Sequence, residues 1–326
     1  MRGGPRRPAA SQSLPTLAAV VRERTGAAWS RARKLCEEGR VHVDGAPVLD
    51  PALRVVPDAA IEIDEQGPRR RAGRLEGDAI VFHDRDLVVI DKPPGLLSVA
   101  DEAGQRDTAM DHARTALRRR NAGDDVPLGV VHRLDRETSG LMVFTRTSLA
   151  KRALAAAFRA HDVERVYLAI AHGDVPEADI QSDLVLDRGD GLRGSHGRFR
   201  RSSAPPPREA RHAVTHVRPV ERLAGATLVE CRLETGRQHQ IRIHLAELGH
   251  PLVGESVYVR DYRGAWIEAP RTMLHARTLG FAHPRGGTPM AWTREPPEDF
   301  AALLARLGGA TSAPRSAPEP GARASR

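Results

Sequence analysis

The first part of the chain has the apolar pattern of a small helical and hairpin unit. The predicted elements are a helix at residues 30–38, a hairpin at 41–49 and a strand at 60–63. Ser30 is expected to cap the helix, and Gly39 is expected to end it. In the hairpin, apolar residues at alternate positions flank Asp44-Gly45, a pair that favours a tight two-residue turn.

The longer remainder contains apolar runs interrupted by polar loops, the pattern of buried strands. The predicted strands lie at residues 87–90, 126–131 and 141–144. The last two bracket a polar loop at 132–140, which would hold Asp135 on a rigid scaffold with its carboxylate facing a cleft. Such a carboxylate is suited to covalent catalysis, but most loop aspartates only cap turns.

Residues 235–249 predict a helix of about three turns that ends at a glycine. Thr235 and Gln238 have the spacing of a capping box. Arg242 would lie beside the apolar face of this helix, where a cation needs a partner. We therefore expect a carboxylate beside Arg242, unless its side chain extends to solvent.

Polar, low-complexity segments divide the chain. Tails at 1–13 and 309–326 are expected to be disordered, because they have too few apolar residues to form a core. A basic linker at 67–77 would separate a small domain at 14–66 from a large one at 78–308. No apolar run is long enough for a membrane span, and no secretory signal peptide is expected.

The charge balance favours a polyanionic partner. The 326 residues include 40% hydrophobic and 28% charged residues, enough for a sizeable core. The net charge is +8 and the isoelectric point is about 10.3. Basic residues crowd the small domain, above all on and just beyond its predicted helix, at Arg31, Arg33, Lys34 and Arg40. These four are the candidate nucleic-acid contacts.

Cysteine and histidine spacings argue against disulfide and metal chemistry. Cys36 and Cys231 are 195 positions apart, which excludes a disulfide framework and a cysteine-ligated zinc site. A metal hydrolase using His239, His244 and His250 is a rival hypothesis, but these histidines do not share a helical face and lack the HExxH pattern. We expect a cytoplasmic protein with no metal ion, cofactor or required protein partner.

The small domain resembles a known RNA-binding module. The run SRARKLCEEGRVHVDGAPVLDP followed by AIEID is similar to the module named after ribosomal protein S-four, in which a basic helix and a hairpin cradle structured RNA. The resemblance covers residues 14–64 and departs at Leu14-Pro15-Thr16-Leu17, where the first helix begins. The alternative is a solvated basic helix beside an ordinary hairpin.

The large domain resembles the pseudouridine synthases of the RluA family, which convert uridine in RNA to its C-glycoside. The similar segments are LVVIDKPPGLLSV, GVVHRLDRETSGLMVFTRT, ERVYLAIAHG, LETGRQHQIRIHLAELGHPLVGESVY and MLHARTLGFAHP. Together they cover residues 78–285, and the HRLD and GRQHQIR motifs are highly specific. A module of the S-four type is a frequent companion in this family.

The resemblance implies roles for individual residues. The nucleophile would be Asp135, with Tyr167 as the active-site tyrosine and Arg242 as the arginine paired with the nucleophile. The implied substrate-binding residues are Arg133, which would fill the stack vacated by a flipped base, together with His132, Arg237 and Leu274. Two departures from the family are Glu255 in place of an aspartate and a longer insertion at 188–211.

The implied fold is α+β, with a mixed, largely antiparallel sheet around a central cleft and a small α/β RNA-binding domain in front of it. The implied activity is isomerisation of uridine to pseudouridine, with large-subunit ribosomal RNA as the leading substrate. Two alternatives are a synthase acting on transfer RNA and a catalytically inactive RNA-binding or ribosome-assembly protein.

Overall fold

The structure is a computed structural model that describes residues 14–48, 51, 53, 55–56, 58–66, 75, 79–100, 106–120, 127–189, 191–198 and 204–308. Both predicted tails lie outside the described residues, as does the predicted linker apart from Leu75. In the part of the chain that the structure describes, no helix combines the length and apolar character needed to cross a lipid bilayer.

Two helices and a three-stranded sheet form the N-terminal part of the fold. Its elements are α1 (Leu17–Thr25), α2 (Trp29–Glu37), β1 (Val41–Val43), β2 (Ala46–Pro47) and β3 (Ile61–Ile63). The strands pair antiparallel in the order β2-β1-β3. Leu17 and Leu35, one from each helix, share a small buried core with Val41 of β1. Thr16 caps α1 by accepting a hydrogen bond from the amide of Ala19.

The turn predicted here is confirmed, but the predicted helix cap is wrong. Asp44 and Gly45 have φ angles of 52° and 79°, as expected for the two-residue turn between β1 and β2. Gly39 follows α2 in the left-handed region, with φ of 69°. However, α2 follows Ala28, which makes no side-chain capping bond. Ser30 therefore lies inside the helix, and turn residues ahead of it determine where the helix begins.

The larger part of the fold is one sheet of eleven described strands. They are β4 (Ile80–His83), β5 (Leu87–Lys92), β6 (Gly129–Val130), β7 (Ser139–Thr145), β8 (Glu164–His172), β9 (Ala178–Val185), β10 (Gly194–Ser195), β11 (Arg211–Leu223), β12 (Ala226–Leu233), β13 (Leu274–Ala282) and β14 (Pro289–Thr293). The order is β10-β9-β11-β12-β8-β13-β7-β5-β4, with β6 beside β7 and β14 beside β13. This confirms the predicted mixed, largely antiparallel architecture.

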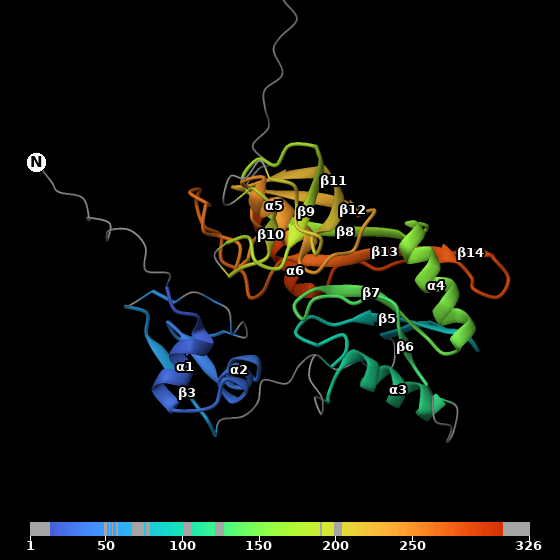
Figure 1. The fold of residues 1–326 in the computed structure, drawn as a ribbon, viewed down its shortest axis with the longest axis horizontal. Coiled ribbons are helices and arrows are strands. Elements are labelled where there is room, and N and C mark those ends of the chain that lie inside the picture. Colours follow the sequence, from blue (N-terminus) through green and yellow to red (C-terminus); the bar gives the residue numbers. More distant parts are fainter. Residues whose placement is uncertain are drawn as a thin grey trace, which may run out of the picture.

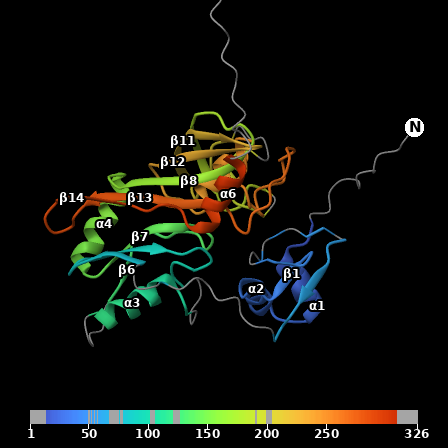
Figure 2. The same cartoon turned by 180° about the vertical axis from the view of Figure 1, so that it is seen from behind.

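The described strands pair antiparallel except at one junction near the middle of the sheet. There β7 and β13 run parallel, with Ser139 opposite His275 and Gly140 opposite Ala276. The two strands lie side by side across the centre of the molecule in both views (Figures 1 and 2). Because the loop that contains Asp135 leads directly into β7, this junction fixes the end of that loop against β13.

Helices cover both faces of the sheet. The helices are α3 (Ala109–Arg120), α4 (Ser148–Ala160), α5 (Gln240–Glu247) and α6 (Glu298–Gly308). Tyr167 and Ala169 of β8 belong to the core that includes α3 and α5, whereas the alternate residues Leu168 and Ile170 pack with α6. Figure 2 shows α6 in front of the sheet. Burial on both faces explains why the sequence of β8 is almost continuously apolar.

A substitution at Gly140 tests the importance of the parallel junction. Gly140 has φ of 107°, and an added Cβ would lie 2.3 Å from the carbonyl oxygen of Ala276. We expect Gly140→Ala to lower the free energy of unfolding by about 2–3 kcal/mol, because both the backbone strain and the clash oppose the pairing of β7 and β13. Urea unfolding would measure the change.

Gly286→Ala is the matched control. Its added Cβ would meet only the hydroxyl of Thr288, at 3.8 Å. Equal stability of the two variants would contradict the proposed role of Gly140.

Candidate active site

A cavity of about 520 Å³ lies where the polar loop before β7 meets β8, α4 and the segment before α5. Asp135, Tyr167, Arg242 and Leu274 all line it, together with Arg133, His132 and Arg237. The structure therefore brings the predicted catalytic and substrate-binding residues to one cavity. Asp135 is the only carboxylate among the lining residues, and five arginines accompany it: Arg133, Arg159, Arg165, Arg237 and Arg242.

Lys92 at the end of β5 fixes one side of the Asp135 loop. Its side chain is fully buried, and its Nζ donates hydrogen bonds to the carbonyl oxygens of Pro93, Leu96 and Arg136 at 2.8–3.0 Å. Burial lowers the pKa of Lys92 to about 7, opposed by the negative charges of Glu137 and Asp135. The lysine thus links two loops and places a cation behind the carboxylate.

Ser98 and Arg271 hold the neighbouring carbonyl groups of the same loop. The hydroxyl of Ser98 donates to the oxygen of Leu134 at 2.7 Å and accepts from its amide at 3.0 Å. Arg271 donates to the oxygen of Glu137 at 2.9 Å and forms a bidentate ion pair with Asp299 of α6. Side chains from separate parts of the chain therefore bind the backbone on both sides of Asp135.

Arg242 binds two carboxylates unequally. Its Nε and one terminal nitrogen each donate to Glu255 at 2.7 Å, while its other terminal nitrogen lies 3.8 Å from Oδ2 of Asp135. The predicted pairing with Asp135 is therefore present, but Glu255 is the closer partner. Burial alone would lower the pKa of Arg242. The negative charge of Glu255, and to a smaller extent that of Asp135, outweighs burial and raises this pKa.

The helix containing Arg242 begins later than the sequence predicts. α5 starts at Gln240, after His239 in the left-handed region with φ of 59°. Thr235 donates to the side chain of Gln240 at 2.8 Å rather than joining a capping box with Gln238. That prediction is wrong because Gln240 also binds the amide of Arg237 and the carbonyl of Val214, which pulls the preceding residues into a loop.

This loop places His239 between Asp135 and Tyr258. Nδ1 of His239 is 2.8 Å from the hydroxyl of Tyr258, and Nε2 is 3.9 Å from Oδ1 of Asp135. Burial raises the pKa of Tyr258, so its hydroxyl is protonated at neutral pH. It can therefore donate to Nδ1, which leaves the proton of a neutral imidazole on Nε2, directed toward the carboxylate.

Strand register brings Tyr167 and Leu274 to the cavity. Tyr167 of β8 is opposite Ala276 of β13, two residues after Leu274. Burial raises the pKa of Tyr167 to about 12, and the nearby Arg165 partly counteracts this. Leu274 is buried and gives the cavity an apolar wall.

The predicted substrate-binding residues differ in their availability. Arg133 and Arg237 are exposed at the cavity. His132 instead stacks on Phe158 at 4.9 Å, and its Nε2 accepts the amide of Val143. Burial lowers its pKa to about 3, so the imidazole is neutral.

In the N-terminal part, the four basic candidates also differ. Arg33 and Lys34 are exposed on α2. Arg31 and Arg40 both donate to the carbonyl oxygen of Glu65, and the side chain of Arg40 is only 13% exposed. Arg33 and Lys34 are therefore the more accessible cations.

The histidines of the metal-hydrolase alternative have separate partners. His244 contacts Ser182 and Thr215, His250 binds the carbonyl of His172, and His239 binds Tyr258. Within the described residues, no group of three metal-ligating side chains has a suitable arrangement. Cys36 and Cys231 are both buried, and neither forms a disulfide among the described residues.

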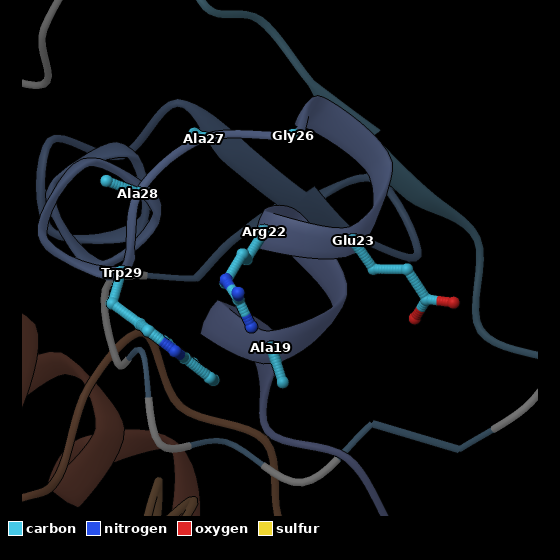
Figure 3. A pocket seen from close by; sticks show the side chains of 7 residues that line it. All are labelled: Ala19, Arg22, Glu23, Gly26, Ala27, Ala28 and Trp29. Carbon is cyan, nitrogen blue, oxygen red and sulfur yellow. The ribbon is translucent and has the colours of Figure 1, made fainter.

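A second hollow of about 820 Å³ lies on the N-terminal part, beside α1 and α2 (Figure 3). The guanidinium of Arg22 lies over the ring of Trp29 there, 5.0 Å from its centroid. Its charged lining consists of Arg22 and Glu23. Without a buried carboxylate and arginine pair, it is a less suitable reaction site than the cavity around Asp135.

Comparison with known proteins decides the family. The chain is 35% identical to the "Ribosomal large subunit pseudouridine synthase D" of Zymomonas mobilis, over 85% of this chain and 88% of that protein. The chain belongs to the RNA pseudouridylate synthase family. This family matches residues 86–247, and the S4 domain matches residues 17–61. The predicted resemblances are thus confirmed, and the protein is a pseudouridine synthase.

Other members give the same result. This pseudouridine synthase is 37% identical to the protein of the same description from Pseudomonas aeruginosa, over 85% of this chain and 87% of that one. Among solved structures, "Human RNA Pseudouridylate Synthase Domain Containing 4" has 25% identity and a TM-score of 0.56, over 70% of this chain and 92% of that chain.

Sequence analysis missed three side chains that shape the synthase site. Lys92 had a weak signal, since it is one of three lysines in an arginine-rich chain and follows a buried strand. Glu255 was visible only as a departure from the family pattern. Arg271 had no signal, because its partners Glu137 and Asp299 are far away in sequence.

Neutralising Glu255 tests whether its ion pair with Arg242 stabilises the fold. Burial would raise the pKa of Glu255, but Arg242 and the amide of Val257 outweigh this and lower it. Its contribution to stability is therefore present above the unfolded-state pKa near 4.5 and is lost as pH falls through the lower folded-state pKa. We expect Glu255→Gln to lower the free energy of unfolding by up to about 3–5 kcal/mol at neutral pH.

Urea unfolding at several pH values would measure this effect, and the variant should lack part of the acid dependence of the wild type. Glu177→Gln is the control, because Glu177 pairs with Arg218 on the surface and both side chains are mostly exposed. Identical pH profiles for wild type and Glu255→Gln would contradict the pairing.

Proposed function

We propose that this pseudouridine synthase isomerises uridines in large-subunit ribosomal RNA with Asp135 as the nucleophile. The observation that carries the proposal is Asp135, the one carboxylate that lines the cavity among the described residues, which is 22% exposed and faces Arg242 at 3.8 Å. Tyr167 lines the same cavity. The choice of RNA is supported by relatives described as large-subunit ribosomal synthases.

The proposed reaction needs an ionised carboxylate and a detached base. The carboxylate of Asp135 attacks C1′ of the nucleotide, and the bond between N1 and C1′ breaks. The uracil then rotates, C5 bonds to C1′, and the bond between Asp135 and C1′ breaks, which regenerates the carboxylate. C5 then loses its proton and N1 gains one, so the reaction has no redox change. Arg242 places a positive charge 3.8 Å from Oδ2 of Asp135.

Tyr167 would act by contact with the base. With its pKa raised to about 12 by burial, its hydroxyl remains protonated at neutral pH. Stacking and hydrogen-bond donation are therefore better supported than removal of the C5 proton. Leu274 would contact the uracil from the apolar wall of the cavity.

Access to the cavity requires the uridine to leave its stack. We propose that the exposed Arg133 fills the space left by the flipped base, which offsets an unstacking cost of a few kcal/mol. Residues 14–66 would form the RNA-binding domain and residues 78–308 the catalytic domain. The protein would act in the cytoplasm, with RNA as its partner.

Mapping pseudouridine in RNA from a strain lacking this gene tests the substrate. We expect one or more large-subunit positions to revert to uridine, as read by mass spectrometry. Reversion only in transfer RNA would favour that alternative. No change in any RNA would favour the inactive RNA-binding protein.

Asp135→Asn tests the nucleophile. We expect turnover to fall by at least about a thousand-fold while RNA affinity stays within a few-fold, because the amide preserves size but cannot attack. Asp261→Asn, at an exposed loop position, should retain full activity. Pseudouridine formed at a normal rate by pure Asp135→Asn protein would refute the assignment.

Neutralising Arg33 and Lys34 tests recognition by the N-terminal part. The double variant Arg33→Gln/Lys34→Gln should bind the RNA more weakly, with a log-log salt slope reduced by about 0.7–0.9 for each lost phosphate contact. Saturating RNA should restore turnover, since the cavity is unchanged. Filter binding at several salt concentrations would measure the slope.

The control is Arg218→Gln/Arg222→Gln. It removes two arginines of β11, which pair with Glu177 and Asp174 respectively. An equal change of slope in both double variants would indicate a general charge effect instead of a specific surface.

A further inference from the structure

Arg165 is a buried arginine of the cavity without a carboxylate partner. Its side chain is 7% exposed, and one terminal nitrogen donates to the carbonyl oxygens of Leu233 and Glu234 at 3.3 and 2.5 Å. Its Nε is buried and has no hydrogen-bond partner among the described residues. None of the carboxylates in the described residues forms an ion pair with Arg165.

Two other arginines that support the site have such partners. Arg242 is bidentate to Glu255, and Arg271 is bidentate to Asp299. A buried guanidinium without an anion is destabilising, and burial accordingly lowers the pKa of Arg165. The cation is nevertheless fixed in place, with its Cζ 5.4 Å from the centre of the Phe158 ring.

The surroundings of Arg165 are also cationic. Arg159 and Arg237 line the same cavity, and Arg237 disfavours the charged form of Arg165. Glu234, whose backbone carbonyl accepts a hydrogen bond from Arg165, directs its carboxylate to His216 at 2.7 Å. This wall of the cavity therefore has an excess of positive charge.

We propose that Arg165 binds a phosphate group of the RNA backbone adjacent to the flipped uridine, which rests on the proposed function of the cavity. A uracil carbonyl could accept a hydrogen bond from the guanidinium of Arg165 but would not reduce the repulsion between Arg165 and Arg237. A phosphodiester does both, because its oxygens accept charge-assisted hydrogen bonds and it carries a negative charge.

Gly236 provides the space for this guanidinium. A Cβ added at Gly236 would lie 2.5 Å from a terminal nitrogen of Arg165. Gly236→Ala should therefore displace the guanidinium without changing any charge, which gives a second, independent variant.

The experiment uses a stem-loop RNA built around the uridine identified by mapping, in ribosomal or transfer RNA. Single methylphosphonates replace the phosphate on the 5′ or the 3′ side of that uridine, which removes charge while keeping shape. We expect wild type to lose about ten-fold or more in affinity at one of the two linkages, a change that corresponds to about 1.4 kcal/mol.

Arg165→Met should weaken binding of unmodified RNA by a similar factor and abolish the methylphosphonate penalty at that linkage only, as a double-mutant cycle requires. Arg165→Lys should keep part of the affinity loss caused by the methylphosphonate, and Gly236→Ala should reduce that loss. Arg306→Met, an exposed arginine of α6 on the other face of the sheet, should retain it fully.

Two results would overturn the inference. One is an unchanged penalty in Arg165→Met and Gly236→Ala, and the other is a wild type insensitive to both methylphosphonates. If mapping finds no modified RNA, the proposed function fails instead. A loss of turnover without loss of affinity in Arg165→Met would assign this residue to the reacting base and would also contradict phosphate binding.

Discussion

The unequal sharing of the Arg242 guanidinium is the interaction on which the site depends. Glu255 is buried beneath it and takes both close hydrogen bonds at 2.7 Å, which compensates the cost of placing the cation there. Asp135, at 3.8 Å, receives the field of the cation without a short hydrogen bond to its oxygen. A carboxylate in this position lies close to a cation while its lone pairs remain available, which is the combination that a nucleophile requires.

Positioning of the carboxylate depends on its backbone. The carbonyl oxygens from residue 134 to residue 137 accept hydrogen bonds from Ser98, the amide of Thr138, Lys92 and Arg271 in turn. The loop has no regular structure, but each of these carbonyls has a defined donor. Rigidity in the site thus comes from side chains of β5 and the segment before β13, which explains how a loop can hold a reacting group as firmly as a strand would.

Local features were predictable from the sequence, and distant pairings were not. The Asp44-Gly45 turn and the position of Asp135 between two strands follow from short-range pattern and motif. The start of α5 was misjudged because Gln240 bonds to Val214, a contact between residues far apart in the chain. Glu255 was visible only as a departure from the family pattern, and its pairing with Arg242 was not predicted. The parallel pairing of β7 with β13, which brings Leu274 and Tyr167 to the nucleophile, has no local signature at all.

The ion pair between Arg271 and Asp299 makes the order of synthesis relevant to activity. Asp299 lies 164 residues after Asp135, so the ribosome has translated the whole sheet before α6 can complete the support of the nucleophile loop. A growing chain can form the N-terminal RNA-binding unit much earlier, because domains fold as they emerge. The S4 unit at residues 17–61 is therefore complete in sequence long before the last side chain that supports the nucleophile loop has been added.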